Sequence, residues 1–144
     1  MIAKGTWTGQ YKYDNNTHLE LRGFEATNFE IKIIDIDNEQ FTGKVQDDLS
    51  TGGTEGIGDI TGIVDGDKIE FVKQMPVLTV IAGRNGTRKT FNKKHRKIYY
   101  SGILSNDGKT ANGRWKFKAG FVLAGLMLIF GKGNGGTWTM KLSE

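Results

Sequence analysis

The sequence of 144 residues has no cysteine, two histidines and a single proline. Without cysteine, a disulfide framework, thiol catalysis and a Cys-ligated zinc or iron–sulfur site are excluded. His18 and His95 are too few for a histidine-rich metal centre, so we expect neither a metal nor a cofactor. Glycine is abundant, at 21 residues, but without accompanying proline it does not indicate collagen. The length predicts one domain spanning residues 1–144.

Long hydrophobic runs are also missing. The most apolar segment, Phe121–Phe130, has ten residues, and a membrane-spanning helix needs about 20. Met1 to Lys4 lead into a strand-like pattern without the apolar stretch of a secretory signal, so we expect a cytoplasmic protein. Leaving Phe121–Phe130 in water would be costly. Three alternatives remain for it: packing within the chain, contact in a homo-oligomer, or contact with a ligand entrance or membrane surface.

Helical periodicity is hard to find, whereas alternation with a period of two dominates. Eight segments alternate in this way. They are Gly5–Asp14, Phe29–Asp37, Gln40–Asp47, Gly58–Asp65, Lys68–Met75, Lys97–Ser105, Ala111–Lys118 and Gly136–Leu142. Asp37-Asn38, Asp65-Gly66 and Asp107-Gly108 lie between paired segments, as in tight hairpins. The pattern predicts an all-β, antiparallel, eight-stranded up-and-down barrel, which leaves no exposed sheet edge.

A large residue, a small polar residue and a glycine follow one another on several predicted strands. The copies are Trp7-Thr8-Gly9, Phe41-Thr42-Gly43, Ile60-Thr61-Gly62, Tyr100-Ser101-Gly102 and, more weakly, Ala111-Asn112-Gly113. Glycine inside a strand permits a sharp bend or close packing, which a barrel needs at its corners.

Three Gly-x-Trp motifs carry a family resemblance. They are Gly5-Thr6-Trp7, Gly113-Arg114-Trp115 and Gly136-Thr137-Trp138. The first resembles the Gly-x-Trp start of lipocalins and avidins, and the whole chain is similar in outline to small bacterial lipocalin-like barrels. The resemblance implies an up-and-down barrel with a possible ligand cavity. It also implies a C-terminal helix for a lipocalin, and no residues remain for one after Ser143, so we expect the avidin-like outline.

The aromatic residues on the predicted inner faces are the candidate ligand site. We select Trp7, Tyr11, Tyr100, Trp115 and Trp138. Large aromatic rings suit a pocket for a flat ligand, whose polar atoms the tyrosine hydroxyls and indole N–H groups would orient. The strand glycines would leave space between the rings. Two interpretations stay open, because a barrel of eight strands is either filled by its own side chains or holds one small ligand.

Basic residues gather between the fifth and sixth predicted strands, in a loop or long hairpin tip without an acidic residue. They are Arg84, Arg88, Lys89, Lys93, Lys94, Arg96 and Lys97. Such a cluster attracts nucleic acid or an anionic membrane surface, or is a solvated loop. Residues 1–70 hold 6 Lys/Arg and 14 Asp/Glu, whereas residues 71–144 hold 14 and 2. This asymmetry indicates polar recognition or self-association of opposite faces, and the alternative is a solvated surface whose charges happen to segregate.

Enzyme chemistry has little support in the sequence. No local motif combines a nucleophile, a base and an orienting group. The aspartates near predicted hairpin ends are explained by turn chemistry. They are Asp35, Asp37, Asp47, Asp48, Asp65 and Asp67. We therefore expect a non-enzymatic barrel that binds a small, mostly apolar or flat ligand. The alternative is an interaction or structural module that acts through self-association or the basic segment.

Overall fold

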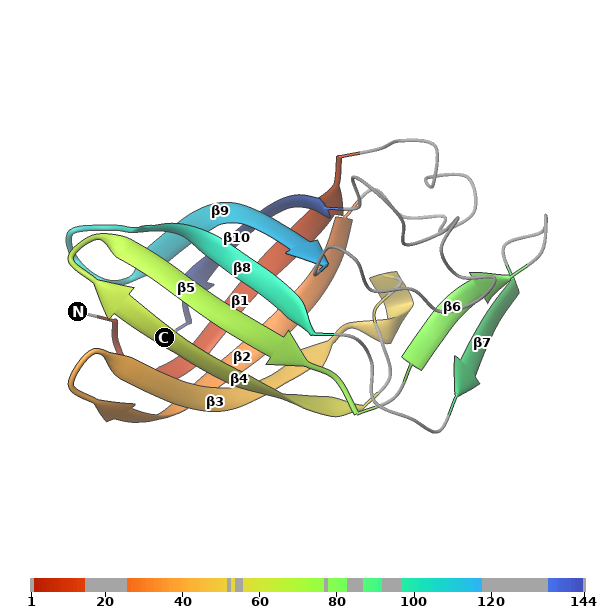
Figure 1. The fold of residues 1–144 in the computed structure, drawn as a ribbon, viewed down its shortest axis with the longest axis horizontal. Helices are drawn as coiled ribbons and strands as arrows, with labels where there is room; N and C mark the ends of the chain where they lie inside the picture. The colour runs from red at the N-terminus through yellow and green to blue at the C-terminus, as the bar shows by residue number, and fades with distance from the viewer. Residues whose placement is uncertain are drawn as a thin grey trace.

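The computed structural model describes residues 2–14, 26–51, 53, 56–76, 78–82, 87–91, 97–117 and 135–143. These ranges contain the strands β1 (Gly5–Tyr13), β2 (Ala26–Asp37), β3 (Gln40–Asp47), β4 (Ile57–Asp65), β5 (Lys68–Gln74), β6 (Leu78–Ala82), β7 (Thr87–Phe91), β8 (Ile98–Leu104), β9 (Thr110–Phe117) and β10 (Gly135–Leu142), and a short 3-10 helix, η2 (Leu49–Thr51). Eight strands close an antiparallel barrel in the order β1-β10-β9-β8-β5-β4-β3-β2 (Figure 1). The predicted fold class is confirmed.

The two ends of the barrel differ. At one end, here called the turn end, tight turns join β2 to β3, β4 to β5 and β8 to β9. Asn38, Gly66 and Gly108 have φ angles of 57°, 63° and 72° in these turns. Asparagine and glycine tolerate this left-handed region best, which explains why the three predicted hairpins form. At the opposite end, the loop end, longer connections follow β1, β3, β5 and β9.

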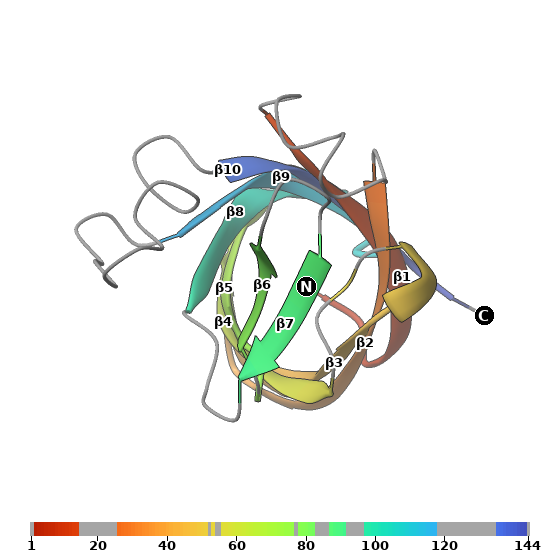
Figure 2. The same ribbon diagram turned by 90° about the vertical axis from the view of Figure 1, so that its right-hand side faces the viewer.

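The connection from β5 to β8 corrects the strand count. The sequence predicted eight strands, but β6 and β7 form an additional antiparallel pair in a separate two-stranded sheet. The pattern hid β6 because Leu78–Ala82 is a short apolar run without clear alternation. Figure 1 places this pair beyond the loop end, and Figure 2 shows it in front of the barrel opening.

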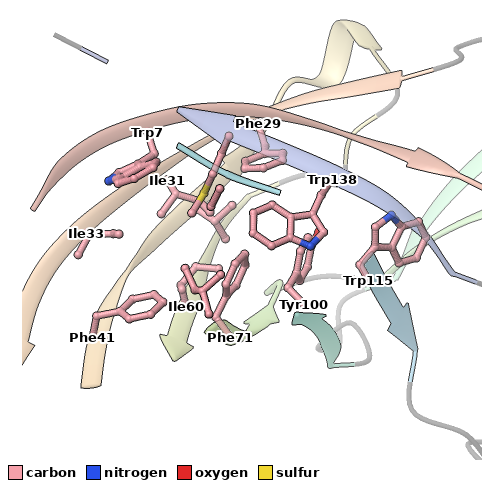
Figure 3. Packing of buried hydrophobic residues seen from close by; sticks show 14 of the residues in the cluster. Trp7, Phe29, Ile31, Ile33, Phe41, Ile60, Phe71, Tyr100, Trp115 and Trp138 are labelled. Atoms are coloured by element: carbon pink, nitrogen blue, oxygen red, sulfur yellow. The ribbon is translucent and has the colours of Figure 1, made fainter. Parts of the chain in front are cut away.

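Alternation along each strand sends one set of side chains into the barrel. On β3 and β4, for example, buried and exposed residues alternate over the whole strand. Large apolar side chains fill the interior, as Figure 3 shows for Trp7, Phe41 and Trp138. Arg114 and Lys116 are exposed, as predicted from their alternation with Trp115. The hydrophobic core is therefore the inside of the barrel.

The strand glycines do not open space inside the barrel, so that prediction is wrong. A Cβ atom at Gly62 would lie 2.5 Å from Cζ of Phe41 and 2.6 Å from Cβ of Phe71. At Gly9 it would lie 2.6 Å from Cζ of Phe29. At these two glycines, neighbouring aromatic rings occupy the space that a side chain would take, because a close-packed interior leaves few voids. These glycines let aromatic side chains approach the backbone of the opposite strand.

Candidate functional site

The five predicted ligand-site residues are all buried. Figure 3 shows four of them, Trp7, Tyr100, Trp115 and Trp138, at different places along the barrel. Tyr100 and Trp138 lie 5.8 Å apart, and Tyr100 stacks on Phe71 with 4.6 Å between ring centroids. Tyr11 contacts Trp115 edge-on at 5.8 Å. Trp7 lies toward the turn end, where its indole N–H donates a hydrogen bond to the N-terminal residue Ala3. The structure therefore brings Tyr11 and Trp115 together, but it separates them from Trp7.

The indole N–H groups already have partners within the protein. Nε1 of Trp7 donates to the carbonyl of Ala3, and Nε1 of Trp115 donates to the carbonyl of Lys12, each at 3.0 Å. Nε1 of Trp138 donates to the carbonyl of Arg114 at 3.0 Å. The prediction that these groups orient a ligand is therefore wrong. A buried N–H must be paired, and the backbone of the barrel supplies the acceptor.

The predicted basic surface is described only in part. Arg84, Lys93, Lys94 and Arg96 lie outside the described residues, as does the apolar segment Phe121–Phe130. Arg88 and Lys89 belong to β7, and Lys97 is exposed just before β8. Both surfaces therefore stay predictions.

A charged cluster that the sequence analysis did not select lies inside the barrel near the loop end. It consists of Tyr11 on β1, Asp47 at the end of β3, and Lys73 on β5. Nζ of Lys73 lies 2.6 Å from Oδ1 of Asp47, and the hydroxyl of Tyr11 donates to Oδ2 at 3.2 Å. The side chains of Lys73 and Asp47 are only 3% and 1% exposed. An ion pair is thus enclosed in a mostly apolar interior.

Aromatic rings complete the surroundings of the lysine. Nζ of Lys73 lies 4.8 Å from the ring centroid of Tyr11 and 5.9 Å from that of Phe29. A cation within about 6 Å of a ring face is attracted by the ring quadrupole, and more strongly where water is excluded. The ammonium group is therefore held by one carboxylate and two rings.

The charge states of the cluster follow from its surroundings. Burial and the nearby Asp47 carboxylate raise the pKa of Tyr11 well above its ordinary value. Burial and Asp47 likewise raise the pKa of Tyr100. Burial by itself lowers the pKa of Lys73, but Asp47 and Tyr11 outweigh this effect, so the net shift is upward. At neutral pH the cluster therefore contains an ammonium group and a neutral phenol, and Tyr100 nearby is neutral as well.

The segment after β3 fixes the position of Asp47. The backbone N–H of Asp48 donates to the carbonyl of Asn28 at 2.8 Å, and that of Asn28 donates to Oγ1 of Thr51 at 3.0 Å. A Cβ atom at Gly53 would lie 2.3 Å from Cβ of Asp47, so this position requires glycine. The carboxylate is consequently held by two strands and by the packing of the following loop.

Extended alternation is the signal that could have revealed the cluster. In the predicted strand Lys68–Met75, Ile69 and Phe71 alternate on one face, and the next residue on that face is Lys73. On β3, the same alternation places Phe41, Gly43 and Val45 on one face, and it continues to Asp47. A lysine and an aspartate at inward positions of two nearby strands could have been expected to pair.

A groove of about 990 Å³ runs over β2, β1, β10 and β9 and reaches the end of β3, where Asp47 is among its lining residues. Outward polar side chains such as Gln10, Asn28, Asn112 and Thr139 line it. Gln10 and Asn28 hydrogen-bond each other through their side-chain amides at 2.9 Å. This groove is a hydrogen-bonding surface, in contrast to the aromatic interior.

Comparison with known proteins supports the fold but shows no family for this chain. No family model matches the chain, and no curated protein matches it. Among solved structures it is similar to EF1p2_mFAP2b bound to DFHBI, with a TM-score of 0.57 and 10% sequence identity, over 97% of this chain and 93% of that one. At this identity the likeness shows the fold alone. The fold and its interior define an eight-stranded antiparallel β-barrel with a buried ion pair, and the lipocalin-like or avidin-like type stays a prediction.

Within the described ranges, no group of three or more metal-ligating side chains is close enough to hold an ion. In the same part of the chain, no helix has the length and apolar character needed to cross a membrane.

Proposed function

We propose that this protein is a non-enzymatic barrel that binds a small, mostly flat or apolar molecule at the loop end of its interior. The observation that carries the proposal is the buried pair of Lys73 and Asp47 beside Tyr11. A buried ion pair contributes little stability compared with well-packed apolar residues. Charged groups placed inside an aromatic interior are, however, suited to fixing the orientation of a ligand.

The packing of the core restricts where a ligand would lie. Phe71 and Tyr100 are stacked with their planes 11° apart, and Trp138 meets Phe71 edge-on at 5.3 Å. A flat molecule would have to separate these rings to enter the middle of the barrel. Tyr11 and Trp115 lie nearer the loop end and meet edge-on at 5.8 Å, so a ligand there would contact their rings without parting the stack of Phe71 and Tyr100. The ligand site that we propose is therefore smaller than the whole interior predicted from the sequence.

The structural neighbour adds support from the same architecture. EF1p2_mFAP2b was solved bound to DFHBI, so a barrel of this outline can hold a ligand. We also propose, from the Gly-x-Trp motifs, that the chain is related to lipocalin-like or avidin-like barrels. Neither point specifies the ligand of this protein.

Native mass spectrometry of the protein purified from its own host tests the proposal. We expect an additional mass that is retained under gentle ionisation and lost when the protein is denatured. The recovered molecule should compete with a neutral fluorescent probe, N-phenyl-1-naphthylamine. Thr139→Tyr, which places a ring in the outer groove, is the control and should leave probe binding unchanged. A protein that retains no ligand and binds no probe would contradict the proposal.

A further inference from the structure

The ammonium group of Lys73 has fewer hydrogen-bond partners than donors. An ammonium group carries three N–H donors. Among the described residues, Lys73 makes one hydrogen bond, to Oδ1 of Asp47, and its other close contacts are the ring faces of Tyr11 and Phe29. A ring face attracts the positive charge but is a poor acceptor for directed N–H bonds. Two donors of a side chain that is 97% buried thus lack an acceptor in the described part of the barrel.

Burying these two N–H donors without an acceptor costs free energy, unless another molecule supplies the acceptor. Buried polar groups are almost always paired, and a charged donor without a partner loses the hydration that it had in water. Asp47 has both carboxylate oxygens engaged, by Lys73 and by Tyr11. Since no atom of the described residues supplies the missing acceptor, a water molecule or a polar atom of a ligand is suited to supply it.

Charge balance selects the kind of acceptor. Asp47 already neutralises Lys73, so the pair carries no net charge. A carboxylate ligand would bring a second negative charge into an apolar interior, next to the carboxylate of Asp47. Because Lys73 is already neutralised, no counter-ion would offset the free-energy cost of removing that ligand charge from water. A neutral oxygen, such as that of a ketone, an amide or a conjugated carbonyl, can accept a charge-assisted hydrogen bond without this penalty.

We propose that the ligand of this barrel is an uncharged aromatic or conjugated molecule whose carbonyl oxygen accepts a hydrogen bond from Nζ of Lys73. The flat part of the molecule lies along the rings of Tyr11 and Trp115. This inference rests on the function proposed above and adds to it the chemical class of the ligand. It assigns Lys73 as the residue that determines specificity, and Asp47 as the residue that holds Lys73 in place.

Three naphthalene probes of equal ring size test the inference. 6-Propionyl-2-(dimethylamino)naphthalene carries a ketone, 2-(dimethylamino)naphthalene carries no oxygen, and 6-(dimethylamino)-2-naphthoate carries a carboxylate. We expect the ketone to bind about tenfold more tightly than the oxygen-free probe, as for one hydrogen bond to a charged donor. The carboxylate should bind most weakly. Dissociation constants are measured by fluorescence titration.

Two variants locate the effect. Lys73→Met should abolish the advantage of the ketone over the oxygen-free probe. Lys44→Met is the matched control, because Lys44 forms a similar ion pair with Asp59 on the exposed surface. It should preserve the order of the three probes. If Lys73→Met does not fold, the ammonium resonance of Lys73 in the 15N-labelled wild-type protein gives the answer, since the ketone should shift it and the oxygen-free probe should not.

The outcomes separate the two proposals. If none of the probes binds, the proposed ligand-binding function is contradicted. If the ketone and the oxygen-free probe bind equally, a ligand site exists but Lys73 is satisfied by water, and the inference is overturned. If the carboxylate binds most tightly, the charge argument is wrong and the ligand is an anion.

Discussion

Lys73 and Asp47 form an ion pair across β4, from strands β5 and β3, with 2.6 Å between Nζ and Oδ1 and almost no exposure to solvent. Lys44 and Asp59 form an ion pair of nearly the same length, 2.5 Å, on the outside of the same sheet. Their side chains are 55% and 65% exposed. The two pairs share their chemistry and differ in environment, which makes each a control for the other.

Removing one lysine from each pair should have unequal effects on stability. Lys73→Met leaves the carboxylate of Asp47 buried without its counter-ion, and we expect the free energy of unfolding to fall by about 3–5 kcal/mol. Lys44→Met removes a solvated pair, and we expect a loss of about 0–1 kcal/mol. Urea unfolding followed by tryptophan fluorescence measures both values. Equal losses in the two variants would show that the interior pair is not dehydrated.

A double variant separates two contributions to the free energy of unfolding: the stabilisation by the ion pair and the destabilisation by a buried charge without a partner. Replacing both partners, as Lys73→Met with Asp47→Leu, should recover most of the stability lost in the single variant, because apolar side chains pack where the charges were. Tyr11 loses its acceptor in this variant, so the recovery should be incomplete. A double variant as unstable as Lys73→Met would contradict this explanation.

Alkaline pH should destabilise the protein. The pKa values of Tyr11, Tyr100 and Lys73 are all raised in the folded state, so these groups keep protons that the unfolded chain releases above about pH 10. Their contribution to stability is complete below that pH and is lost as the pH rises through the folded-state pKa values. We expect the urea midpoint to fall steeply above about pH 10. Tyr11→Phe should make the fall less steep, whereas a midpoint independent of alkaline pH would refute the prediction.

Gly62 should not tolerate a side chain. An added Cβ would lie 2.5 Å from both Cζ of Phe41 and the carbonyl oxygen of Glu70. Overpacking of this kind costs about 1–3 kcal/mol, and we expect Gly62→Ala to lower the unfolding free energy by that amount. Thr61→Ala, at the exposed neighbouring position, should change it by no more than about 0.5 kcal/mol. If the two substitutions have the same effect, the ring of Phe41 does not occupy the space above Gly62.

Asn38 should be replaceable by glycine but not by a β-branched residue. It holds a φ angle of 57° in the turn between β2 and β3. In this left-handed region a side chain branched at Cβ is strained, so Asn38→Val should cost about 1–2 kcal/mol. Asn38→Gly should be nearly neutral, since glycine adopts this conformation freely. Thermal unfolding of the two variants measures the difference, and equal stability would argue against a left-handed turn.

The sequence by itself determined most of the barrel. Alternation on β3, β4 and β5 placed Phe41, Ile60 and Phe71 inside, and the structure buries all three. The turn residues Asn38 and Gly66 indicated two hairpins, and both form. These features are local, because the side-chain period of a strand and the φ preference of a turn residue depend only on neighbouring residues. The strand β6 was missed for the same reason, since its residues do not alternate.

Only the tertiary structure decided what the interior contains. Asp47 was interpreted as a turn residue, and its partner Lys73 lies 26 positions away in the sequence. The space above Gly62 was interpreted as room for a ligand, and the ring of Phe41 from the neighbouring strand occupies it. Pairing between charges and filling of voids depend on the register of strands and on which rings meet across the closed barrel. These are distances between distant parts of the chain, and the periodicity of a single strand contains no information about them.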